Sequence, residues 1–110
     1  MAATKTSAIP KMTIDPETID GVKRWVSDAD LAVIIEQAGI FFPGAKALHL
    51  YSYMSPESDD PSDENVVLEI DSDLPRVEFN TARRNLHSAF DERGLPAYNR
   101  LAITRKYTGK

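Results

Sequence analysis

The stretch from Phe42 to Asp71 constrains the fold of this chain more than any other. Two apolar segments, residues 47–53 and 66–70, flank a loop that holds two prolines and five acids between residues 54 and 64. Such a loop has too little apolar surface to pack, so we expect it to lie in solvent. The flanking segments are short and bounded by turn residues, which predicts two strands of one sheet.

Helices are predicted on both sides of these strands. Asp15-Pro16 predicts the start of a short helix, because Asp can cap free amides and Pro suits the first helical position. The segment Ser27–Asp30 is similar to a capping box and starts a second helix, with Gly39 as its left-handed terminator. A third helix is expected over residues 77–93, ending at Gly94. A last strand, at a sheet edge, is expected over residues 98–107.

The predicted order of elements is α-α-β-β-α-β, which gives an α+β fold. We expect a small mixed three-stranded sheet with helices packed on one face, because the apolar sides of all elements then share one core. Residues 1–14 are predicted to form a flexible N-terminal tail. Residues 15–110 are predicted to form a single domain, as the length of 110 residues favours.

Side chains of the first predicted strand alternate between two faces. Leu48 and Leu50 are expected in the core, whereas His49, Tyr51 and Tyr53 form a polar aromatic stripe on the other face. The first helix, with its tryptophan, either covers this stripe or leaves it open, and the covered arrangement is favoured. If the stripe is open, Tyr51 is a candidate partner contact, since aromatic residues are enriched at interfaces.

Charge is distributed unevenly along the chain. Residues 55–75 hold eight acids and no base, whereas residues 76–110 hold eight bases and three acids, and the net charge is −4. The two segments either offset each other or offer a basic surface to an acidic partner. Arg83 and Arg84 fall on the exposed side of the predicted third helix and are further candidate partner contacts. Aromatic residues do not interleave these bases, so nucleic-acid binding is not expected.

The composition excludes several kinds of site. The chain has no cysteine, so disulfides and thiolate metal sites are ruled out. Neither His49 nor His87 has a second histidine nearby in sequence, so a zinc site is not expected. No segment has the character of a signal peptide or the length of a membrane span, and we expect a cytoplasmic protein without membrane association.

The order of turn, strand, acidic loop and carboxylate-bearing strand is the layout of a metal-dependent phosphoryl-transfer site. Phe42-Pro43-Gly44 supplies the turn, residues 48–51 the strand, and residues 62–70 a serine-aspartate motif that leads into the second strand. This span resembles the small nucleotidyltransferase domains of the DNA polymerase β superfamily, including the minimal ones paired with partner toxins in bacteria. The resemblance implies a turn that approaches nucleotide phosphates and three carboxylates that bind Mg²⁺.

The sequence departs from this family at the residues of the chemistry. Ser52-Tyr53 stands where the family has a glycine-serine pair, and a Tyr ring hinders a close approach of backbone to phosphate. Asn65 stands in place of the second metal-binding aspartate, and no acid occurs around Leu101, where the third is expected. Only Asp63 remains, and one carboxylate is a weak site for Mg²⁺. We therefore expect no metal site, no cofactor and no catalysis.

Three functions remain open. The favoured one is a non-catalytic, nucleotidyltransferase-like binding or regulatory module that acts through a protein partner or a copy of itself, as the resemblance to antitoxin-type members implies. The second is a divergent nucleotidyltransferase that uses Mg²⁺ and Asp63, helped by Glu64 or Asp71. The third is an unrelated small α+β protein-interaction domain. The acidic loop could also bind Ca²⁺, although it lacks the spacing of an EF-hand.

Overall fold

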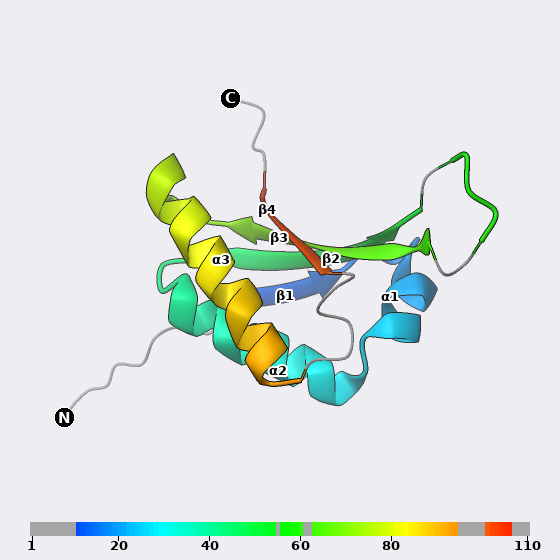
Figure 1. The fold of residues 1–110 in the computed structure, drawn as a ribbon, viewed down its shortest axis with the longest axis horizontal. Helices are drawn as coiled ribbons and strands as arrows, with labels where there is room; N and C mark the ends of the chain where they lie inside the picture. Colours follow the sequence, from blue (N-terminus) through cyan, green and yellow to red (C-terminus); the bar gives the residue numbers. More distant parts are fainter. Residues whose placement is uncertain (1–10, 55, 61–62, 95–100, 107–110) are drawn as a thin grey trace.

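The computed structural model describes residues 11–54, 56–60, 63–94 and 101–106. Within these residues the chain forms four strands and three helices (Figure 1). In chain order they are β1 (Lys11–Ile14), α1 (Ile19–Trp25), α2 (Asp28–Phe41), β2 (Ala47–Tyr53), β3 (Asn65–Asp71), α3 (Arg76–Glu92) and β4 (Leu101–Arg105). None of the helices in these ranges is both long enough and apolar enough to cross a membrane.

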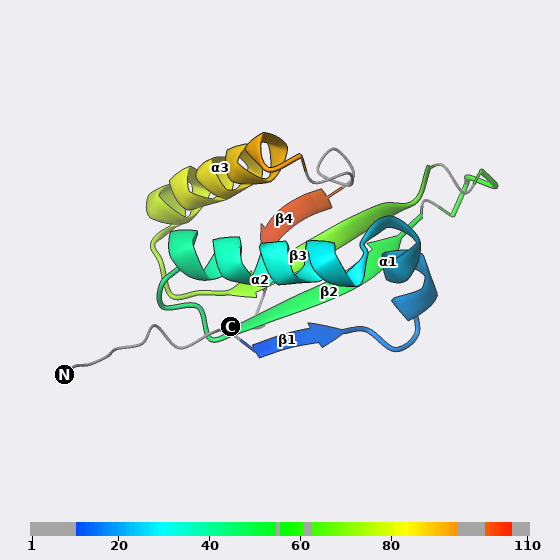
Figure 2. The same ribbon diagram turned by 90° about the horizontal axis from the view of Figure 1, so that it is seen from below.

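The strands form one mixed sheet in the order β1-β2-β3-β4. β1 is parallel to β2, β2 is antiparallel to β3, and β3 is parallel to β4. The helices lie on one face of this sheet, with α2 and α3 side by side (Figure 2). The predicted α+β fold is thus confirmed, as is the edge position of the last strand among the described residues.

The prediction of three strands was wrong, because β1 adds a fourth. The sequence places residues 11–14 in the flexible tail, because four residues give too weak a signal for a strand. In the structure Met12 pairs with Leu48 and Ile14 pairs with Leu50. This register turns both apolar side chains of β1 toward the core and leaves Lys11 and Thr13 exposed. The strand is stabilised by the neighbour that it joins rather than by its own sequence.

The ends of the helices follow the predicted caps at two of four places, the start of α2 and the end of α3. The prediction that the first helix starts at Asp15-Pro16 was wrong, because α1 begins at Ile19 and no side-chain hydrogen bond caps it. The Asp15 carboxylate instead accepts the Thr18 hydroxyl at 3.2 Å in the turn that leads into α1. In the capping box, the Asp30 amide donates to Ser27 Oγ at 3.1 Å, and the Ser27 amide donates to the Asp30 carboxylate. Gly94, with φ 70°, follows the end of α3 as predicted.

The prediction that Gly39 terminates α2 was wrong. The helix continues to Phe41, and no described residue before Gly94 has a positive φ. The extra turn places Phe42, which is 1% exposed, in the core, where its ring lies 5.0 Å from that of Phe79 on α3. Burial of this aromatic ring favours continued helix at Gly39 over a left-handed turn.

One hydrophobic core joins the helices to the inner face of the sheet. Its fully buried side chains alternate along the central strands, as predicted for Leu48 and Leu50 on β2, and continue on β3 with Val66, Leu68 and Ile70. The helices contribute Val22, Ile34, Ala38, Leu86 and Phe90, all at 0% exposure. Every described helix and strand contributes side chains to this core. The core therefore fixes the position of each helix relative to the sheet.

The opposite face of the sheet is not covered by any described helix. His49, Tyr51 and Tyr53 lie there, and Tyr53 is 54% exposed. The favoured prediction, that α1 and Trp25 cover this stripe, was therefore wrong. α1 packs on the same face as α2 and α3, because Val22 and Val26 belong to the common core.

The connections of the sheet have opposite hands. Because the central pair is antiparallel and the strands follow in order, the β1–β2 and β3–β4 crossovers can share a face only if one is right-handed and the other left-handed. Parallel crossovers are right-handed in about 98% of cases, and two of them would have placed α3 on the far face. Here the fully buried apolar side chains of the central strands lie on one sheet face, so both connections cover that face.

Candidate functional site

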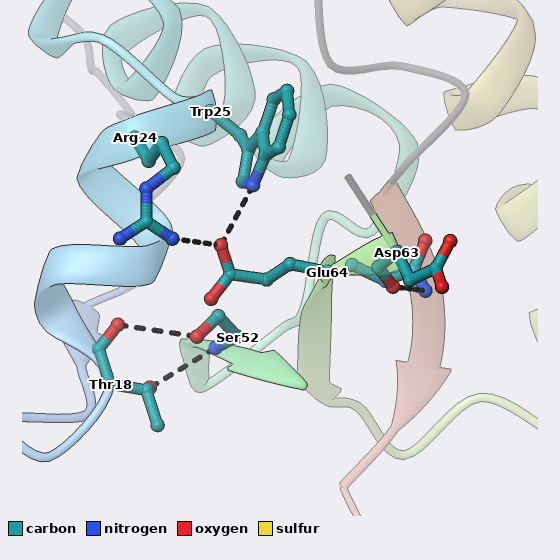
Figure 3. Close-up of polar contacts among 7 residues, drawn as sticks. Thr18, Arg24, Trp25, Ser52, Asp63 and Glu64 are labelled. Atoms are coloured by element: carbon teal, nitrogen blue, oxygen red, sulfur yellow. Dashed lines mark hydrogen bonds and ion pairs between the residues drawn. The ribbon is translucent and has the colours of Figure 1, made fainter. Parts of the chain in front are cut away.

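The candidate site lies where the end of β2 meets the start of α1. The Ser52 amide donates a hydrogen bond to Thr18 Oγ1 at 3.1 Å, and Ser52 Oγ donates to the Thr18 carbonyl at 3.4 Å (Figure 3). Thr18 is the residue that immediately precedes α1. Ser52, predicted as part of a remnant phosphate turn, is therefore bound to the residue before this helix.

Glu64 reaches the same place from the residue before β3. One of its carboxylate oxygens accepts hydrogen bonds from Arg24 Nη1 at 2.5 Å and from Trp25 Nε1 at 2.9 Å. The Glu64 side chain is only 12% exposed, whereas that of Arg24 is 51% exposed. Figure 3 shows the carboxylate enclosed between α1 and Ser52. It forms a half-buried ion pair in which the acid is enclosed and the base reaches solvent.

The electrostatics of Glu64 favour its charged form. Burial by itself disfavours the carboxylate and raises the pKa. The hydrogen bonds from Trp25 and Arg24, the charge of Arg24 and a hydrogen bond from Ser52 outweigh burial, so that the pKa of Glu64 lies below its ordinary value. This carboxylate is therefore a poor general acid or base near neutral pH, because it holds no proton to give and binds one weakly.

Gly21 allows α1 to lie against this cluster. A Cβ atom at this position would overlap Ser52 Oγ and Glu64 Oε2 and would lie 2.8 Å from Ser52 Cβ. No side chain larger than hydrogen fits between the helix and the strand end without displacing them. The space beside Ser52 is thus filled by the backbone of α1.

Asp63, the predicted remnant of the metal site, points away from this cluster. Its side chain is exposed, and its carboxylate accepts the Ser58 hydroxyl at 2.5 Å in the acidic loop. The Asn65 side-chain amide donates to the backbone carbonyl of Asp63 at 3.1 Å. Figure 3 shows the Asp63 and Glu64 side chains on opposite sides of the chain. Within the described ranges, no group of three or more acids or histidines could hold a metal ion.

The candidate partner contacts lie on two separate surfaces. Tyr51 is on the open sheet face, opposite Val67 and with its ring 5.9 Å from that of His49. Partial burial, together with the charge of Glu69, raises the pKa of Tyr51, which stays a neutral phenol at physiological pH. Arg83 and Arg84 are exposed on α3, which covers the other face. The structure does not combine Tyr51 and the arginines into one surface.

Sequence reasoning missed the roles of Glu64, Arg24, Trp25 and Gly21. One signal was present for Glu64: it shares the parity of Val66 and Leu68, so strand alternation directs it toward the helix-covered face. A glycine inside a short helix, at Gly21, was a second signal, because it marks a close approach. The identity of the helix above Glu64 could not be read from the sequence.

Comparisons of this chain with family models, with curated proteins and with solved structures find no match. Its chemistry must therefore follow from the groups in the site. The Ser52 hydroxyl donates to the Thr18 carbonyl, and one oxygen of the Glu64 carboxylate accepts from both Arg24 and Trp25. Together, these hydrogen bonds hold α1 against the β2–β3 pair.

Proposed function

We propose that this chain is a non-catalytic binding module, built on a nucleotidyltransferase-like scaffold, that acts through a protein partner. The observation that carries the proposal is the state of Glu64. The acid that enters the space beside Ser52 is bound by Arg24 and Trp25, and Gly21 brings α1 against it. The space beside Ser52, where a phosphate would have to approach, is used instead to hold a helix on the sheet.

The strand arrangement supports the scaffold part of the proposal. β2 and β3 are antiparallel neighbours, and Tyr53 pairs with Asn65. The predicted remnant of the phosphate turn and the acids that precede β3 therefore lie at the same end of the sheet. A nucleotidyltransferase layout requires this proximity, and the pairing of Tyr53 with Asn65 supports the proposed scaffold.

The surfaces left free support the binding part. The open sheet face presents His49, Tyr51 and Val67, which are half-buried, beside polar neighbours such as Glu69. Mixed aromatic and aliphatic groups of this kind are typical of the centre of protein interfaces. On the other side of the molecule, α3 presents Arg83 and Arg84, which suit carboxylates. Both surfaces fit a protein partner.

A titration with Mg²⁺ and ATP, followed through the backbone amide signals, tests the non-catalytic part. We expect no saturable shifts at Ser52 or Asp63 and no transfer of labelled nucleotide to protein or RNA. Transfer that disappears in Asp63→Ala would overturn the proposal in favour of the Mg²⁺-dependent enzyme.

Sedimentation of the chain alone tests whether the partner is a second copy of the chain. A monomer supports a separate protein as the partner. A dimer that is lost in Tyr51→Asp identifies a second copy as the partner.

A further inference from the structure

A basic groove runs between α3 and the edge strand β4. It has a volume of about 600 Å³ and is lined by Arg76, Phe79, Asn80, Arg83, Thr104 and Arg105, among others. A second hollow of about 250 Å³ continues it along β4, past Arg83, Arg84 and His87. The two hollows share Arg83 and Ile103, so they follow one line beside the strand.

The charge of this groove is positive and uncompensated. Among the residues that the structure describes, no acid lines either hollow, whereas four arginines do. Arg105 is fixed, since its guanidinium lies 4.6 Å from the centre of the Phe79 ring and donates to the Leu74 carbonyl. The side chains of Arg76, Arg83 and Arg84 form no ion pair or hydrogen bond within the described ranges. Free arginines of this kind bind carboxylates or phosphates.

The backbone of β4 offers a row of hydrogen-bonding groups beside these arginines. The Lys106 amide donates to the Ile70 carbonyl of β3 at 2.9 Å. Because the backbone groups of successive residues point to opposite sides of a strand, those of Ala102 and Thr104 also point toward β3. The amides and carbonyls of Leu101, Ile103 and Arg105 consequently point away from β3. Because β4 is the last strand of the sheet, no described strand pairs with them. A free edge of this kind can accept a further strand.

We propose that the edge of β4 binds an extended acidic peptide as a fifth strand. Its backbone bonds to Leu101, Ile103 and Arg105, and alternate side chains enter the groove, where acids meet Arg76 and Arg83. Alternate residues of a strand are about 7 Å apart, and these two arginines are about 10 Å apart along α3, within the reach of flexible side chains. This inference rests on the proposed binding function and names its partner class.

A peptide fits this surface better than the other acidic ligands. A nucleic acid would use the arginines but not the backbone groups of β4, and the net charge of −4 repels a long polyanion. The acidic loop of a second copy carries Pro56 and Pro61, which cannot donate to a ladder. A strand from a different protein, with an acid at every second position, satisfies both the edge and the arginines.

The test uses the full chain and an end-capped peptide of about ten residues that alternates glutamate with valine. Binding is followed by the amide signals of Leu101, Ile103 and Arg105. We expect saturable shifts there, and about tenfold weaker binding to the double variant Arg76→Ala/Arg83→Ala, whose exposed positions leave the fold intact. The matched control is Arg93→Ala, an arginine paired with Glu36 at 3.8 Å outside the groove, which should change binding less than about twofold.

Two further peptides separate the contribution of the acidic side chains to binding from that of the backbone hydrogen bonds. A lysine–valine peptide of equal length should not bind, and the acidic peptide methylated on alternate amides should bind about tenfold more weakly. Equal binding of the methylated peptide, absence of peptide binding, or tighter arginine-dependent binding of a single-stranded RNA would each overturn the fifth-strand proposal. None of these results touches the proposed non-catalytic function, which fails only if nucleotide transfer is found.

Discussion

Asp63 and Glu64 are neighbours in sequence and have opposite environments. Glu64 lies under α1 with two donors on its carboxylate, whereas Asp63 is exposed and bound to Ser58 in the loop. Successive side chains near a strand point to opposite faces, which separates the two acids. The acid that the family resemblance selects is therefore the less constrained one, and the acid that the resemblance ignores holds the helix.

Substitution of these two acids should give different losses of stability. Glu64→Ala removes the carboxylate that accepts from the half-buried Trp25 indole N–H and that pairs with Arg24, which should lower the free energy of unfolding by about 2 kcal/mol. Asp63→Ala, at an exposed position, should change it by less than about 0.5 kcal/mol. Urea unfolding measures both losses, provided that the dependence of the free energy of unfolding on urea concentration is the same in the two variants. Equal losses in the two variants would contradict a structural role for Glu64.

The depressed pKa of Glu64 makes the stability depend on pH. The folded chain holds this carboxylate ionised more strongly than the unfolded chain, in which its pKa is near the ordinary 4.5. Its contribution is therefore complete above that pH and is lost as the pH falls through the lower folded value. Glu64→Gln should be less stable than the wild type at pH 7, and the difference should shrink toward pH 3. A difference that stays constant from pH 7 to 3 would rule out this linkage.

At the scale of elements, α1 is positioned by contact rather than by its own sequence. The helix has seven residues, and no side-chain hydrogen bond caps its start. A helix this short is unstable alone, so its place depends on Val22 in the core and on the polar contacts of Thr18 with Ser52. Gly21 allows the core contact of Val22 and the hydrogen bonds of Thr18 to form together, because it has no Cβ to separate the helix from β2.

Gly21→Ala tests this close approach. Alanine favours an exposed helix interior by about 1 kcal/mol, yet here its Cβ meets Ser52 and Glu64, so we expect a net loss of about 2 kcal/mol. Gly44→Ala is the matched control, since nothing lies within 4 Å of a Cβ at that position. Thermal unfolding of the two variants decides the point. A stabilised Gly21→Ala would show that α1 lies farther from β2.

At the scale of the whole molecule, a single core connects the two crossovers. α2 and α3 pack together over the hairpin of β2 and β3, and Phe90 of α3 is buried in the same cluster as Val22 of α1. The elements therefore stabilise one another across the full width of the sheet. Cooperative unfolding follows from such shared burial.

Phe90→Ala should reveal this coupling. The cavity left by a fully buried ring should cost about 3–5 kcal/mol. Trp25, the single tryptophan of the chain, lies on α1 and reports unfolding there by fluorescence, while circular dichroism reports the helices together. We expect both transitions to move to lower urea concentration by the same amount. Val77→Ala, at a position 75% exposed, should move neither. A fluorescence midpoint that stays in place while the dichroism midpoint shifts would show that α1 unfolds independently.

The sequence alone determined the elements whose signals are local. Alternation of Leu48 and Leu50 predicted β2 over the residues at which it is found, and periodicity placed α3 within one residue of its observed bounds. The capping box at Ser27 and the terminator at Gly94 were equally readable, because a cap involves only residues close in the chain.

Only the tertiary structure decided what depends on distant neighbours. β1 exists because β2 offers Leu48 and Leu50 as partners, and α2 passes Gly39 because Phe42 is buried against Phe79. The hands of the two crossovers follow from having one apolar sheet face to cover. The role of Glu64 was set in the same way, by a helix about 40 residues earlier in the sequence, since Arg24 and Glu64 are 40 positions apart. A carboxylate gains its function from the groups that surround it, and sequence order does not specify those groups.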